Sequence, residues 1–171
     1  MMPQENIVRN CLIVLLLAAL TLGAAPDATE KVSRNFASTL YKTDAIDPQL
    51  LNHIHDSIVA GDRDITRQEI IDILTNAKTQ LKQLKPESQT ELKTIRWQLT
   101  RVSFEKAKNI GGYFHTMGKF KPADQVFTLK PNFSDRLRDN LDAVNMYANR
   151  IILVIRAMNG TPKIVGFSAD L

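Results

Sequence analysis

The chain has almost none of the residues that build cross-linked or cysteine-ligated sites. Its 171 residues include one cysteine, Cys11, and three histidines. Cys11 lies in an apolar N-terminal segment, so a domain that follows this segment contains no cysteine. This count excludes a disulfide scaffold, a cysteine-ligated zinc site and a c-type haem attachment. The chain is long enough to bury a core without such help.

Strong charge of one sign is also lacking. The formal net charge is +4, the sequence pI is near 9.3, and aromatic residues make up only 6% of the chain. A balance this mild permits attraction to anionic lipid, glycan or nucleic acid but requires none of them.

The N-terminus has the pattern of a secretory signal. A polar start containing Arg9 leads into the apolar run Cys11–Leu22, and small residues follow at Gly23, Ala24 and Ala25. The run is shorter than the roughly 20 residues of a membrane-spanning helix. We therefore expect residues 1–25 to be a signal peptide, with an uncleaved anchor as the alternative, and residues 26–171 to be the periplasmic or secreted domain. An exported protein is expected to have no nucleic-acid partner.

Apolar residues recur at steps of three and four between Ser134 and Asn159, which predicts one long helix. The run Ile151–Ile155 is apolar on every side, so we expect other helices to surround this half, and Gly160 has the place of a helix-ending residue. The residues of this stripe are Leu137, Leu141, Val144, Ala148, Ile151, Ile155 and Met158.

Four further helices are expected from periodicity and capping signals. They cover residues 27–41, residues 48–60 after the Asp47-Pro48 start, residues 67–85 after the capping box Thr66–Glu69, and residues 88–110 from the capping box Ser88–Glu91. The predicted fold is all-α: a single bundle of four to five helices, with more than half of the domain helical.

Periodicity fails over residues 111–131, the one long irregular connection. A small hairpin of residues 117–121 against 125–130 is one interpretation. The tail at residues 163–167 is expected to be a short strand or an extended strap.

This irregular segment is the predicted partner-binding site, because aromatic anchors with a basic rim suit a binding loop. Its candidate residues are Tyr113, Phe114, Lys119, Phe120, Lys121, Phe127 and Lys130. In the alternative interpretation, Phe114, Phe120 and Phe127 fold back and cap the open end of the bundle.

No catalytic set, metal site or cofactor site is predicted. The acidic stretch 62–69 does not fit a calcium loop, and residues 112–119 depart from the phosphate loop in length and in having Phe120 at the magnesium-binding position. The predicted function is therefore non-enzymatic protein–protein binding, for example as an accessory or assembly subunit of an envelope complex. Alternatives are an envelope enzyme that uses residues 111–131 with His115, a cofactor-binding bundle, and a lipid-binding bundle in peripheral contact with a membrane. The oligomeric state is left open.

Overall fold

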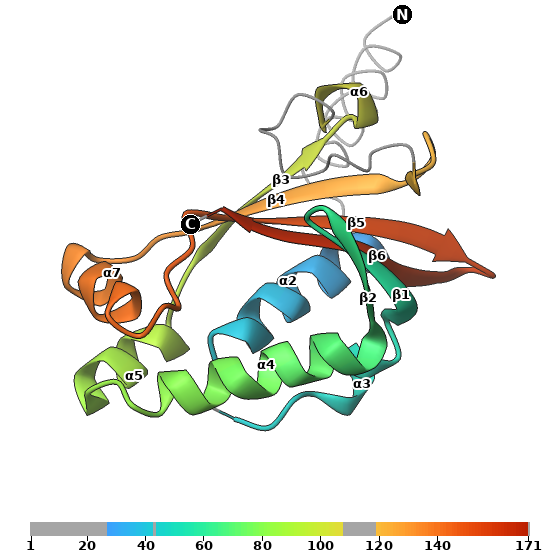
Figure 1. The fold of residues 1–171 in the computed structure, drawn as a ribbon. Coiled ribbons are helices and arrows are strands. Elements are labelled where there is room, and N and C mark those ends of the chain that lie inside the picture. The colour runs from blue at the N-terminus through green and yellow to red at the C-terminus, as the bar shows by residue number, and fades with distance from the viewer. Residues whose placement is uncertain (1–26, 43, 108–118, 171) are drawn as a thin grey trace, which may run out of the picture.

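The computed structural model describes residues 27–42, 44–107 and 119–170, which alternate between helices and strands (Figure 1). The strands are β1 (Ile54–Ala60), β2 (Arg63–Thr66), β3 (Trp97–Val102), β4 (Gln125–Pro131), β5 (Arg150–Met158) and β6 (Thr161–Asp170). The helices are α2 (Ala28–Leu40), α3 (Pro48–Leu51), α4 (Arg67–Leu81), α5 (Pro86–Lys93), α6 (Phe104–Ala107) and α7 (Asp135–Asp142).

The six strands form one mixed sheet in the order β2-β1-β6-β5-β4-β3. β1 runs parallel to β6, and every other neighbouring pair is antiparallel. The prediction of an all-α helical bundle is therefore wrong, and the fold is α+β. Figure 1 shows α2 and α4 on one side of this sheet, which they cover as a second layer.

Two of the predicted helices are confirmed. α2 begins where the Asp27 side chain accepts a hydrogen bond from the Glu30 N–H, and it buries Val32, Phe36 and Leu40. α4 begins at the predicted capping box: the Thr66 hydroxyl accepts from the Glu69 N–H, and Glu69 accepts from the Thr66 N–H at 2.7 Å. Both starts rest on local hydrogen bonds that the sequence specifies.

The long helix predicted over residues 134–159 is wrong in its second half. Residues 135–142 do form α7, with Ser134 as its N-cap, but residues 150–158 form the interior strand β5. Ile151, Leu153 and Ile155 face one hydrophobic core and Ile152 and Val154 face another. A strand buried on both faces needs a continuous apolar run, and the β-branched residues here favour a strand.

Two other predicted helices are replaced by strands. In residues 48–60 the helix α3 ends at Leu51, and β1 follows. In residues 88–110, α5 begins earlier, at Pro86, and ends at Lys93 before β3. Gly61, the residue directly after the predicted helix 48–60, forms the β1–β2 turn at φ 62°. The side chains of Ile54, Ile58 and Leu99 are buried or half-buried as members of the sheet.

The hairpin predicted for residues 117–130 is also wrong, because β4 pairs with β3 and β5. Of the predicted first strand, the described residues 119–121 belong to no strand, and residues 117 and 118 lie outside the described residues. The predicted strand at the tail is confirmed: it belongs to β6, and residues 161–170 pair along their whole length with β5.

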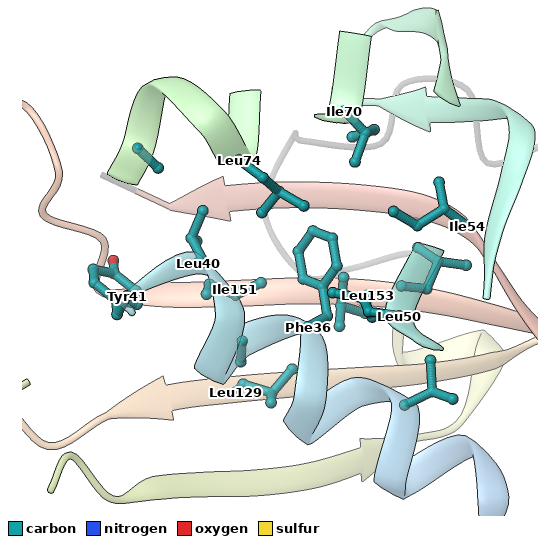
Figure 2. Packing of buried hydrophobic residues seen from close by; sticks show 14 of the residues in the cluster. Phe36, Leu40, Tyr41, Leu50, Ile54, Ile70, Leu74, Leu129, Ile151 and Leu153 are labelled. Carbon is teal, nitrogen blue, oxygen red and sulfur yellow. The ribbon is translucent and has the colours of Figure 1, made fainter. Parts of the chain in front are cut away.

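Hydrophobic cores cover both faces of the sheet. Figure 2 shows the larger one, in which Phe36 and Leu74 of the two long helices meet Leu129, Ile151 and Leu153 of the sheet. The smaller core on the opposite face joins Ala107, Phe120, Val126, Ile152, Val154 and Val165, among others.

Gly166 shows how closely the smaller core is packed. A Cβ atom added there would lie 2.7 Å from the Phe120 ring, so only glycine fits without a shift of that ring.

Candidate functional site

The predicted binding residues that the structure describes do not form one cluster. Tyr113, Phe114 and the alternative catalytic residue His115 lie outside the described residues. Phe120 and Phe127 are 6% and 1% exposed and belong to different cores on opposite faces of the sheet. Neither ring is therefore available in this conformation as an exposed anchor for a partner.

The three predicted lysines are exposed, and each has different surroundings. Lys119 pairs with Asp64 of β2 at 2.5 Å, and Lys121 lies in the exposed turn before β4. Lys130 is exposed near the end of β4, where it lines a polar cavity described below. Lys119 and Lys121 thus lie before β4, and Lys130 lies near its far end, so the three lysines do not form one rim.

A different site stands out on the face covered by α2 and α4. It is a cleft of about 320 Å³, which we call the apolar cleft. Four segments line it: the end of α2, the middle of α4, the loop before β5, and the last residues of β6. Their residues are Leu40, Tyr41, Ile73, Asn76, Ala77, Gln80, Asn145, Met146, Tyr147, Ala148, Phe167 and Ala169.

The cleft lies where β6 extends beyond the end of its neighbour β1. The last residue of β1 that pairs with β6 is Ala60, opposite Phe167, whereas β6 continues to Asp170. Within the described ranges, no strand therefore pairs with the outer edge of residues 168–170. The sheet face beside this edge is left open between α4 and residues 145–148.

The chemistry of the lining suits an apolar group. None of the lining residues carries a charged side chain, and the polar members are the amides Asn76, Gln80 and Asn145 and the tyrosines. Ile73 is 37% exposed at the cleft, and Met158 is the other large apolar side chain with such exposure in the part of the chain that the structure describes. Binding pockets for organic groups are typically concave and mostly apolar, with volumes from roughly 300 Å³ upwards.

One signal in the sequence could have pointed to this cleft. The buried stripe of α4 runs through Ile70, Leu74, Ala77 and Leu81, and Ile73 is apolar although it lies beside that stripe. A single exposed isoleucine is common on protein surfaces, so this signal is weak by itself.

The floor of the cleft is held by buried polar groups at the end of α2. The Lys78 ammonium donates to the carbonyl oxygens of Thr39 and Lys42 at 3.1 and 3.0 Å, which satisfies acceptors at the helix C-terminus. Burial lowers the pKa of Lys78. Tyr41 is 1% exposed, and its ring centroid lies 5.6 Å from that of Trp97 and 5.3 Å from that of Phe133.

Tyr41 should make stability depend on alkaline pH. Burial, and then the nearby Tyr147, raise the pKa of the Tyr41 hydroxyl above its usual value of 10, and the Ala148 N–H opposes this only in part. Above about pH 10 the unfolded chain loses this proton and the folded chain keeps it, so the unfolding free energy should fall by about 1.4 kcal/mol per pH unit. Urea unfolding between pH 9 and 11 checks this against Tyr41→Phe. Lys78 titrates in both proteins, so its contribution to the pH dependence is the same in each. If the unfolding free energy falls equally with pH in the wild type and in Tyr41→Phe, the prediction is contradicted.

A second, polar cavity of about 340 Å³ adjoins the apolar cleft, and we call it the Arg138 cavity. Tyr147 and Ala148 line both sites. The Arg138 guanidinium lies 5.9 Å from the centroid of the Tyr147 ring, and the Tyr147 hydroxyl donates to Asn149. The lining contains two cationic side chains and no acidic one: Lys130, Pro131, Asn132, Phe133, Arg138, Tyr147, Ala148 and Asn149.

A third cavity of about 210 Å³ lies on the opposite face of the sheet, and its residues argue against catalysis there. His55 Nδ1 is 2.7 Å from the Ser57 carbonyl oxygen and accepts from the Ser57 N–H, so its contacts are with the backbone and not with the Ser57 hydroxyl. The cations beside it, Lys119 and Arg156, are paired with Asp64 and Asp124. This arrangement lacks the hydrogen-bonded nucleophile and base of covalent catalysis.

No group of three or more histidine, cysteine, aspartate or glutamate side chains in the described ranges could hold a metal ion. No helix within the same ranges is long and apolar enough to cross a membrane.

Comparisons with known proteins do not identify a family for this chain. No protein-family model matches the chain. No curated protein matches it either. One solved structure that is similar is described as "Rd1NTF2_04 with long sheet"; it is 9% identical, with a TM-score of 0.42, and the alignment covers 82% of this chain and 98% of that one. A likeness at this level carries no argument about function, which has to come from the site.

Proposed function

We propose that this protein works by binding, without chemistry of its own, and that the apolar cleft receives a large apolar side chain of a partner protein. The observation that carries the proposal is the cleft itself: an opening of about 320 Å³ with an uncharged lining, bordered by the exposed Ile73. A partner side chain that fills it would remove its own apolar surface and that of Ile73 from water, which is favourable at about 25 cal/mol per Å².

The floor of the cleft supports this use. Tyr41 and Ala77 are buried at 1% and 4% exposure, so the walls that a ligand would contact are set by the folded core. A preformed site binds with less loss of conformational freedom than one that must order on contact.

The proposed place of action is outside the cytoplasm, as an accessory or assembly subunit of an envelope complex. Its support is the signal-like pattern of residues 1–25, which lie outside the described residues. The partner would then be another exported protein.

Site-directed photocrosslinking tests the proposal. A photoreactive residue at Gln80, on the exposed side of the cleft, should give a discrete adduct with one protein in the cells that make this chain. The adduct should be lost with Ile73→Asp, because a carboxylate at the cleft opposes an apolar guest. Met158→Asp is the matched control, since Met158 has the same 37% exposure but lies at the β5–β6 turn.

An adduct that persists in Ile73→Asp would contradict the proposal, as would the same adduct from a photoreactive residue at Lys121. Both variants should keep the wild-type melting temperature to within a few degrees, because exposed substitutions usually change stability by about 0.5 kcal/mol or less.

A further inference from the structure

The outer edge of β6 has backbone groups arranged to receive another strand. Gly61 donates its N–H to the carbonyl oxygen of Phe167 at 3.3 Å, so the backbone groups of Phe167 point away from β5. Residues 167–170 pair with β5 in regular register. Because backbone direction repeats every second residue, the N–H and C=O of Ala169 point to the same outer side.

The same edge borders the apolar cleft. The side chains of Phe167 and Ala169 line the cleft, so they lie on the face of the sheet that α4 covers. A strand added beside β6 would direct every second side chain to this face. The peptide residue that pairs with Ala169 would therefore direct its side chain into the cleft, while the peptide backbone pairs with the edge.

The cavity that adjoins the apolar cleft carries positive charge. Tyr147 and Ala148 separate the apolar cleft from the Arg138 cavity and line both. Arg138 and Lys130 line that cavity without an acidic neighbour in the lining. Arg138 does pair with Asp135 at 3.5 Å, but that carboxylate is 95% exposed and holds the guanidinium weakly. A ligand that reaches this cavity should carry negative charge.

We infer that the partner segment is an extended peptide that pairs with the outer edge of β6, inserts a large apolar side chain into the apolar cleft, and places an acidic side chain at the Arg138 cavity. This rests on the proposed function and specifies its ligand. Main-chain hydrogen bonds to Ala169 would contribute affinity, and the two side-chain sites would contribute specificity, as in other cases of strand addition. The charge pair would act mainly on the association rate and on the choice of partner.

Selection from a library of random linear peptides, displayed on phage and panned on the full chain, provides the probe. Peptides that also bind Ile73→Asp are removed. The inference expects the remaining sequences to share a large apolar residue and, a few positions away, Asp or Glu. Such a peptide should bind Arg138→Glu about tenfold more weakly at low salt, and Arg136→Glu, an exposed control on the same helix, with nearly unchanged affinity.

Backbone N-methylation of the selected peptide tests the strand directly. Methylation should cost about tenfold in affinity at the one peptide residue whose N–H donates to the Ala169 carbonyl oxygen and little at its neighbours, because Ala169 is the described residue of this edge whose backbone groups face outward. Hydrogen exchange at the Ala169 amide should slow when the peptide binds.

The failures of the two proposals differ. A peptide that depends on Ile73 but tolerates methylation at all positions, or that binds as a helix, overturns the strand inference and leaves the cleft proposal standing. Wild-type affinity in Arg138→Glu overturns the acidic component. Failure of the library to give any peptide that depends on Ile73 overturns both.

Discussion

Ile151→Asp is expected to unfold the protein. Ile151 is fully buried in β5, between β4 and β6, and its side chain lies against the helices of the larger core (Figure 2). An unpaired carboxylate there costs several kcal/mol, a large part of the roughly 5–15 kcal/mol that keeps a domain folded. The expected result is the loss of the cooperative urea transition, with circular dichroism as the measurement.

The control for this substitution is Met158→Asp on the same strand. Met158 is 37% exposed, so the new carboxylate stays hydrated and the urea midpoint should move little. Equal stability in Ile151→Asp and Met158→Asp would show that β5 is not the centre of the fold.

Arg156→Leu is expected to lose about 3–5 kcal/mol of unfolding free energy, because it leaves a buried carboxylate without its countercharge. Arg156 Nε and one terminal nitrogen donate to the two oxygens of Asp124 at 2.8 and 2.7 Å. The Asp124 side chain is 1% exposed and also accepts from the Lys121 N–H at 2.7 Å, so the pair closes the turn before β4.

The double variant Asp124→Asn with Arg156→Leu should recover part of this loss. Asparagine keeps an oxygen for the Lys121 N–H but has no charge to leave unpaired, so the losses should not add. Urea unfolding of the two single variants and the double variant forms the cycle. A loss below about 1 kcal/mol in Arg156→Leu would show that the pair behaves like a surface ion pair.

Helix starts that depend on local hydrogen bonds could be predicted from the sequence. The Thr66–Glu69 capping box and the Asp47-Pro48 start use side chains within one turn of the helix, and both occur as predicted. Such signals do not depend on the rest of the fold. The predicted Ser88–Glu91 box does not start a helix, because α5 already begins at Pro86. The short interior strands could not be found in the same way, because their stability comes from neighbours distant in sequence.

The run Ile151–Ile155 shows why periodicity alone does not distinguish a buried strand from a helix. Apolar residues at steps of three and four fitted a helix, but a run that is apolar on every side fits a strand buried on both faces equally well. The deciding signal was local: Asn159 and Gly160 have φ values of 51° and 77° and form the turn of the β5–β6 hairpin. Asn-Gly between apolar runs predicts a hairpin more strongly than a helix end.

The binding role predicted for residues 111–131 stays a prediction, but two aromatic residues of this segment have other places in the fold. Its aromatic residues Phe120 and Phe127 were assigned to a loop, whereas the sheet uses both to fill its two cores. Lys130 is the described member of that set that lines the cavity beside the apolar cleft. The cleft itself joins Leu40, Ile73, Met146 and Ala169, which only the folded sheet brings together.

The most direct test of the central claim, that the apolar cleft is the binding surface, is hydrogen–deuterium exchange of the full chain with and without the partner found by crosslinking. Binding should slow exchange in residues 73–80, in residues 145–148 and at the Ala169 amide, and leave residues 119–124 on the opposite face unchanged. Protection confined to residues 119–124 or to β3, with the cleft segments unchanged, would contradict the account.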